Sequence, residues 1–158
     1  MSTEKRLSLF TKTVRERERS LYRVALVMLR SKADAEDAVS DGIEATFRHL
    51  DSLRDDSALP AYLMRCTINA CNNMLRRRKR EYSVEDCEIY SPAVHPEIPV
   101  WAYLMGLKEK YRIPIAMRYG EDMSIAEISR ILRLPQGTVS TRISRGLKQL
   151  RDQIERQV

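Results

Sequence analysis

The stretch that most limits the possible folds of this chain is residues 124–145, SIAEISRILRLPQGTVSTRISR. On both sides of Pro135 its apolar residues recur at spacings of three and four, the period of amphipathic helices. Ser124 is expected to cap the first helix, with Glu127 completing a capping box. Pro135 ends that helix, because proline disfavours the α conformation in the residue before it. The segment therefore predicts two short helices joined by a tight turn, the second starting near Gln136.

The second predicted helix carries an outer face whose residue types suit double-stranded DNA. Its apolar residues predict a buried stripe made of Val139, Ile143, Leu147 and Leu150. Away from that stripe, short polar side chains and arginines are the types that reach base edges and phosphates in a major groove. We expect base contacts from Ser140, Thr141, Arg142 and Arg145, and phosphate contacts from Thr138 and Lys148. The alternative is a charged face that only meets water, as on most amphipathic helices.

The composition predicts an almost entirely helical protein with a polyanionic partner. The 158 residues include only 5 glycines and 6 prolines. Of the net charge of +6, only one unit comes from residues 1–100, which hold 17 Lys and Arg against 16 Asp and Glu. Residues 101–158 hold 11 against 6, so the positive excess lies with the helical hairpin, as a nucleic-acid partner requires.

The sequence predicts no cofactor, no metal and no membrane insertion. The three cysteines, Cys66, Cys71 and Cys87, lack metal-ligand spacing and are expected to be free thiols. The chain has no phosphate-binding glycine loop and no Ser/His/Asp arrangement, so we expect no enzyme activity. Its apolar runs are too short to span a membrane and its first residues are too polar for a secretory signal, which predicts a cytoplasmic protein.

Two helices are predicted in the N-terminal part of the chain. The first covers residues 4–31, and its apolar face begins with Leu7. The second starts at Asp34, an N-cap candidate, and runs to about Leu53 with Phe47 on its inner face. Together their apolar faces predict part of a small helical bundle.

The outer face of the second helix is acidic. Its side chains are Glu36, Asp37, Ser40, Asp41 and Glu44, with Asp34 at the helix start. Between them, Gly42 is expected to cost about 1 kcal/mol of helix stability relative to alanine. The face is interpreted either as a docking surface for a basic protein or as a solvated surface, and charge alone favours the second.

A third helix is predicted from Leu59 and Pro60, because proline is tolerated in the first helical turn. Its side chains combine aromatic and amide groups with the terminal basic run RRRKR at 76–80. Such a face suits single-stranded DNA, whose bases stack and hydrogen-bond while cations hold the backbone. The candidate contacts are Tyr62, Arg65, Asn69, Asn72, Arg76 and Arg77. A basic helix end that only complements the helix dipole is the competing interpretation.

Residues 82–100 divide the chain. They contain three prolines and several acids but no Lys or Arg, which predicts an extended acidic linker. The sequence thus predicts an all-α protein with one helical domain at 1–81 and a second at 101–158. In the second domain, one helix is expected from Trp101 to Tyr111. Another is expected to have Pro114 near its start and Tyr119 on its apolar face, ahead of the two hairpin helices.

This order of segments resembles the bacterial RNA polymerase sigma factors of the small, extracytoplasmic-function (ECF) group. The tetrad DAED at residues 34–37 matches the start of the family's core-binding helix. Residues 62–80 match its amide-rich helix without gaps, and residues 128–143 match its helix-turn-helix. Each motif is degenerate, but three in order at the right separations form a specific signal that covers nearly the whole chain.

The resemblance implies a subunit that directs promoter-specific initiation of transcription. The domain at 1–81 would dock through the acidic helix on the β′ clamp helices of core polymerase. It would also capture the melted non-template strand of the −10 element, helped by the loop around 52–60. The domain at 101–158 would read the −35 element, with the polymerase β flap as a second contact, and the acidic linker would run through the RNA exit path. Promoter DNA and core polymerase are thus the implied partners, and an anti-sigma factor is a further candidate.

Several residues depart from the family pattern. Ser40 and Asp41 replace a usual Gln-Glu pair, and Tyr62 replaces a tryptophan. An arginine, Arg133, stands at the glycine of the hairpin, where a left-handed conformation would cost it roughly 1 kcal/mol. Two other functions stay open: a stand-alone helix-turn-helix regulator, and a sigma-like decoy that binds polymerase without initiating.

Overall fold

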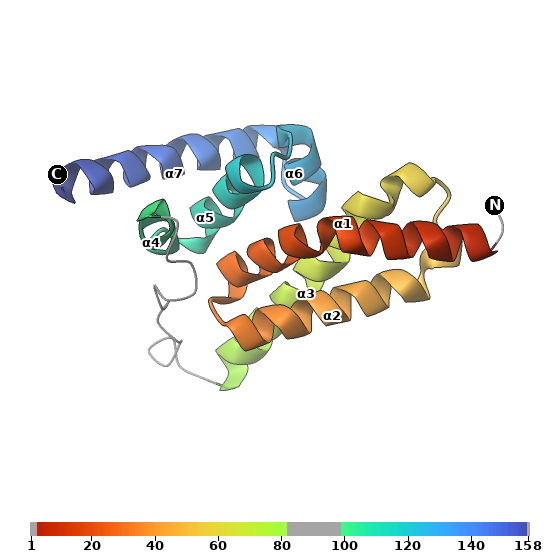
Figure 1. Cartoon of the computed structure of the whole chain (residues 1–158). Helices are drawn as coiled ribbons and strands as arrows, with labels where there is room; N and C mark the ends of the chain where they lie inside the picture. Colours follow the sequence, from red (N-terminus) through yellow and green to blue (C-terminus); the bar gives the residue numbers. More distant parts are fainter. Residues whose placement is uncertain (1–2, 82–98, 158) are drawn as a thin grey trace. The chain divides into compact units, whose positions relative to one another are not determined.

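The computed structural model describes residues 3–81 and 99–157, and every regular element within those ranges is a helix (Figure 1). The chain divides into two compact units, Met1–Cys87 and Glu88–Val158. The all-α fold class with two small helical domains is confirmed. Most of the predicted linker lies outside the described residues. Within the described ranges, no helix is both long and apolar enough to cross a membrane.

Three long helices make up the described part of the first unit: α1 (Thr3–Leu29), α2 (Lys32–Arg48) and α3 (Leu59–Glu81). Each packs against the other two (Figure 1). The helices form this bundle because each has an apolar face to bury. The core side chains include Leu21, Leu26, Leu29, Ala38, Leu63 and Ile68.

The start of α2 differs from the prediction, because its N-cap is Ser31 rather than Asp34. The Ser31 hydroxyl accepts a hydrogen bond from the backbone N–H of Asp34 at 3.3 Å. The Asp34 carboxylate instead pairs with Arg78 of α3, which also donates to the Leu29 carbonyl at 2.7 Å. Asp34 therefore lies in the first turn, where the helix dipole favours a negative charge, and joins α2 to α3.

The end of α2 also differs, because the helix stops at Arg48, short of the predicted end. Two 3₁₀ turns follow, Leu50–Ser52 and Asp56–Ala58. Leu50 packs with Phe10 and Leu59 in a small cluster of buried residues. Burial of Leu50 against α1 and the start of α3 turns the chain away from the axis of α2.

Two residues predicted for the core lie at the surface. Leu7 is 46% exposed and Phe47 is 53% exposed. The ring of Phe47 still lies against that of the buried Phe10, with 5.6 Å between centroids. Both exposed residues are near an end of their helices, where neighbouring helices cover less of the apolar face than helical periodicity implies.

The second unit is built around the predicted hairpin. Its described elements are α4 (Pro99–Met105), α5 (Glu109–Ile115), a π-helical turn η5 (Ala116–Gly120), α6 (Ile125–Leu132) and α7 (Gln136–Gln157). Helix α7 packs against α4, α5 and α6 (Figure 1). At its contact with α5 the packing is close, because a Cβ on Gly146 would lie 2.5 Å from Ile115 Cδ1 and 3.0 Å from Tyr111 Cβ.

The helices before the hairpin do not break where the sequence predicted. The break falls at residues 106–108, where Lys108 has an extended backbone and precedes α5. Tyr111 is therefore buried inside α5, and Pro114 lies within that helix rather than near the start of a new one. The helix widens into the π turn directly after this proline, which cannot donate a backbone hydrogen bond. Tyr119, predicted for an apolar face, is 63% exposed.

The helix-turn-helix forms as predicted. The Ser124 hydroxyl accepts from the Glu127 N–H and lies 3.1 Å from the Glu127 carboxylate, so the serine arm of the capping box is present. Arg133 ends α6 in the left-handed conformation, with φ 58° and ψ 47°. The N–H of Leu134 then bonds to the Ser129 carbonyl at 3.1 Å. This cap turns the chain into α7 within a few residues.

Candidate functional site

The candidate −10 residues share one face of α3. Their spacings of three and four from Tyr62 to Arg76 align them along the helix axis, and Arg77 flanks the stripe. Three of them are half-buried, namely Tyr62, Arg65 and Asn72, and three are exposed, namely Asn69, Arg76 and Arg77. We call these six residues the α3 stripe. The fold therefore presents aromatic, amide and cationic groups together along one helix.

Tyr62 places an uncharged ring at the start of the α3 stripe. Burial raises the pKa of the Tyr62 phenol, and the neighbouring Cys66 adds to the rise, while Arg65 acts in the opposite direction. The ring therefore stays neutral at physiological pH and can stack on a base. The Nε atom of Arg65 is buried without a hydrogen-bond partner among the described residues, so this donor is not used within the unit.

The basic run at the end of α3 divides into two roles. Arg78 is half-buried and is used internally, through the Asp34 carboxylate and the Leu29 carbonyl. Arg76, Arg77, Lys79 and Arg80 are exposed. Only the exposed members of the run are placed for an external polyanion, a distinction that the sequence RRRKR does not reveal.

The acidic residues of α2 form an exposed surface apart from Asp34. Glu36, Asp37, Ser40, Asp41 and Glu44 are all exposed and follow one another at helical spacing; we call them the α2 acidic face. Glu44 pairs with Arg48 at 2.5 Å, an i,i+4 contact at the surface. The exposed ring of Phe47 extends this face at the end of α2, and helical periodicity had assigned it to the core.

Five of the six predicted −35 residues lie along one side of α7. Thr138, Thr141, Arg142, Arg145 and Lys148 recur at spacings of three and four, and we call them the α7 face. The exception is Ser140, which is exposed but stands roughly 100° or more around the axis from Thr138, Thr141 and Arg142. The buried side of α7 includes Val139, Ile143 and Leu150, as predicted.

A hollow of about 340 Å³ adjoins the α7 face. It is lined by Lys110, Tyr111, Gly137, Thr138, Thr141, Arg142 and Arg145. Lys110 comes from α5, and its ammonium lies 5.0 Å from the centroid of the Tyr111 ring. Together with the positive end of α7, these cations suit a phosphate group. Lys110 could not be predicted as part of this site from the sequence, because it is the packing of α5 on α7 that brings it there.

No group of three or more potential metal ligands is found in the parts of the chain that the structure covers. Burial raises the pKa of the Cys71 thiol to about 12, so this thiol is protonated and inert at neutral pH. Cys66 is half-buried and free, and Cys87 lies outside the described residues.

Comparison with known proteins assigns both units to one family. A family model of sigma-70 region 2 matches residues 13–81, and a model of sigma-70 region 4 matches residues 98–150. The ECF RNA polymerase sigma factor SigM of Mycobacterium tuberculosis is 32% identical over 146 residues, covering 89% of this chain and 74% of its own. This chain belongs to the ECF group of sigma factors. The resemblance seen in the sequence is thereby confirmed.

Other relatives of this ECF sigma factor agree in length and fold. SigW of Bacillus subtilis is 27% identical, with 85% of this chain and 82% of its own covered. The sigma factor RpoE of Bartonella quintana, solved in complex with the anti-sigma factor NepR, superposes with a TM-score of 0.79 at 23% identity. That match covers 92% of this chain and 96% of the other. CnrH, solved with the cytosolic domain of CnrY, gives a TM-score of 0.74 at 22% identity, over 94% and 89% of the two chains.

Proposed function

We propose that this ECF sigma factor recruits core RNA polymerase to promoters with separate −35 and −10 elements and starts transcription there. One observation carries the proposal: the α2 acidic face, the α3 stripe and the α7 face are solvent-accessible surfaces on different helices. Each lies in the sigma region whose family role suits its chemistry: α2 and α3 in region 2, α7 in region 4.

The α7 face would read the −35 duplex. An α-helix fits the major groove, and Arg142 and Arg145 can each donate two hydrogen bonds to a guanine edge. Phosphates on either side of the groove would be held by Thr138, Lys148 and the Lys110 hollow, with the positive end of α7 adding to the attraction. Ser140 lies outside the α7 face, because it points in another direction around the helix axis, so it would not reach the same base edges.

The α3 stripe would hold the melted non-template strand of the −10 element. Bases taken out of the stack would pack on Tyr62 and bond to the amides of Asn69 and Asn72, while the exposed arginines bind the backbone. Trapping unpaired bases gives the binding free energy that offsets their unpairing, so this step needs no ATP.

The α2 acidic face would dock on a basic surface of core polymerase, the β′ clamp helices by analogy with the family. The exposed Phe47 would add apolar contact at the end of this face. RpoE of Bartonella quintana was solved in complex with the anti-sigma factor NepR, so an anti-sigma factor is a further partner to test for this chain.

The test is transcription in vitro with the full chain, bacterial core polymerase and genomic fragments, followed by sequencing of the transcript starts. A two-part motif shared upstream of new starts is the expected result. Arg142→Ala should reduce starts by losing −35 preference, and Asn69→Ala with Asn72→Ala by losing −10 preference. Binding to polymerase without new starts would favour a decoy. Neither polymerase binding nor new starts would favour a stand-alone regulator.

A further inference from the structure

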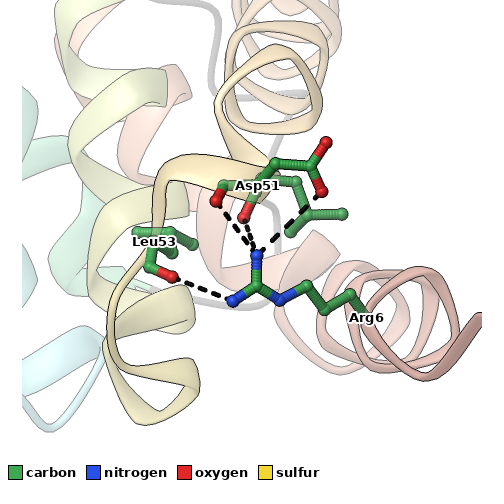
Figure 2. Close-up of polar contacts among 4 residues, drawn as sticks. Arg6, Asp51 and Leu53 are labelled. Carbon is green, nitrogen blue, oxygen red and sulfur yellow. Dashed lines mark hydrogen bonds and ion pairs between the residues drawn. The ribbon is translucent and has the colours of Figure 1, made fainter. Parts of the chain in front are cut away.

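Arg6, near the start of α1, reaches the connection between α2 and α3 (Figure 2). Its Nη1 atom donates to the carbonyls of Leu50 at 3.4 Å and Asp51 at 3.1 Å, and its Nη2 atom donates to the Leu53 carbonyl at 3.2 Å. The Asp51 carboxylate lies 4.0 Å from Nη1. A single guanidinium thus gathers three carbonyls of one loop, 44–47 residues away in the chain.

The contact has a clear physical basis. Once α2 ends, the carbonyls of the loop no longer accept regular α-helical hydrogen bonds. The Leu50 carbonyl accepts one long bond from the Leu53 N–H, at 3.4 Å. A guanidinium offers planar, diverging donors that can serve several acceptors at once, which a lysine cannot do in the same geometry. The carboxylate of Asp51 adds little, because its side chain is 90% exposed. The hydrogen bonds from Arg6 to the backbone carbonyls therefore hold the loop in place.

Apolar packing fixes the same part of the loop from its other side. Leu50 is buried with Phe10 and Leu59, and Leu53 packs partly buried against this cluster. Since Phe10 and Arg6 are both on α1, this helix holds the first half of the loop by polar and apolar contacts. The second half is held locally, because the Asp55 carboxylate accepts from the Ser57 N–H at 3.0 Å.

Exposed side chains of the loop come shortly before the α3 stripe in the chain. Ser52, Arg54 and Ser57 are exposed, and the loop leads at Leu59 into α3, less than one turn before Tyr62. The position of these outward side chains relative to Tyr62 therefore depends on where residues 50–53 are held. Arg6 precedes residues 13–81, which the region 2 family model matches, so that match assigns no role to it.

We propose that Arg6 is a positioning residue for −10 recognition. It holds the loop so that the exposed side chains around Arg54 and the α3 stripe contact the same melted strand. This inference rests on the proposed function of the α3 stripe. It adds a determinant of base preference that touches no DNA itself and lies on a different helix.

The experiment uses the full chain with core polymerase on a promoter whose −10 and −35 elements are both randomised, and sequences the DNA in open complexes. Arg6→Gln should reduce base preference at the −10 positions roughly tenfold, as expected for lost bonds to a charged group. Preference at −35 should be unchanged and serves as the internal standard. Arg17→Gln is the matched control, because it removes the same charge from an exposed position on α1.

A second variant and a second measurement guard against misfolding. Arg6→Lys keeps the charge and most of the aliphatic side chain but loses the diverging donors of the guanidinium. Its −10 preference should therefore fall between those of wild type and Arg6→Gln. Tryptic cleavage after the exposed Arg54 should be faster in both Arg6 variants than in wild type and Arg17→Gln. This measures loop fixation directly, without DNA.

Each result decides the question. If Arg6→Gln or Arg6→Lys formed fewer open complexes on all −10 sequences alike, with the base preference of wild type, Arg6 would be a structural contact only. That result would overturn this inference but not the proposed function. Unchanged cleavage after Arg54 would also overturn it. Wild-type protein without any −10 preference would overturn the proposed function, and the inference with it.

Discussion

Gly42 of α2 lies directly against the backbone of Thr67 in α3. A Cβ atom on Gly42 would stand 2.7 Å from the Thr67 Cα, 2.8 Å from its nitrogen and 2.3 Å from its Oγ1. The groups at this contact are small on α2 and already hydrogen-bonded on α3. The Thr67 hydroxyl donates to the Leu63 carbonyl of its own helix at 3.0 Å. The α2 acidic face and the α3 stripe are consequently carried by two helices that cross at close range.

The closeness of this contact reverses the expected effect of alanine at residue 42. Helix propensity alone predicts that Gly42→Ala stabilises by about 1 kcal/mol. Overpacking against backbone atoms costs about 1–3 kcal/mol, so we expect a net loss in the free energy of unfolding. Urea unfolding measures it. Gly137→Ala, at an open position with no atom near the new Cβ, is the control and should be neutral or slightly stabilising. A stabilised Gly42→Ala would contradict the tight packing.

The contact between Gly42 and Thr67 is an example of a feature that could not be predicted from the sequence, whereas the helix-turn-helix could. The helix-turn-helix was predictable because its determinants, the cap at Ser124 and the proline after α6, act within a few residues. From the sequence, Gly42 was predicted only to weaken α2. The need for a glycine there comes from Thr67, a residue of another helix that the local sequence does not reveal. The roles of Arg6 and Arg78 also depend on partners more than 40 residues away.

Arg77 and Arg78 should separate DNA binding from stability. Arg78→Ala removes the bonds to Leu29 and Asp34 that join the three helices of the first unit. We expect a loss of about 1 kcal/mol in the free energy of unfolding, because the group is charged but partly exposed. Arg77→Ala should leave stability unchanged and weaken binding of single-stranded −10 DNA. Urea unfolding and fluorescence anisotropy measure the two effects, and equal behaviour of the two variants would refute the division of roles.

Arg133 should be a site where glycine stabilises the protein. Its left-handed backbone, φ 58°, strains an arginine by about 1 kcal/mol but not a glycine. Arg133→Gly should therefore raise the free energy of unfolding by up to about 1 kcal/mol. Arg130→Gly, inside α6 on an exposed position, should lower it by about as much. Thermal unfolding of both variants gives the comparison, and a shift of the same sign in both would disprove the strain at residue 133.

Cys71 should make stability fall at alkaline pH. Burial raises its pKa from 9.0 to about 12, so above pH 9 the unfolded chain loses this proton while the folded protein keeps it. The unfolded state then binds fewer protons, and the free energy of unfolding should drop by up to about 1.4 kcal/mol per pH unit. Urea unfolding of wild type and Cys71→Ala at pH 8 and pH 10 isolates this contribution. Their stability difference should shrink at pH 10, and a constant difference would show that Cys71 titrates normally.

Arg142 and Lys110 line the same hollow but should fail in different ways when removed. Arg142→Ala should cost roughly 1–3 kcal/mol on the preferred −35 sequence and relax preference at one position, because it removes a base contact. Lys110→Ala should weaken binding to all sequences alike and reduce the slope of log affinity against log salt by roughly one, because it removes a phosphate contact.

The control is Lys108→Ala, which changes an exposed lysine of the same segment outside the hollow. It should leave both the sequence preference and the salt dependence unchanged. Titrations of duplex variants at several salt concentrations distinguish these outcomes. If Arg142→Ala lost the same affinity on every sequence, Arg142 would be a phosphate contact. Base recognition by α7 would then depend on Arg145 and Thr141.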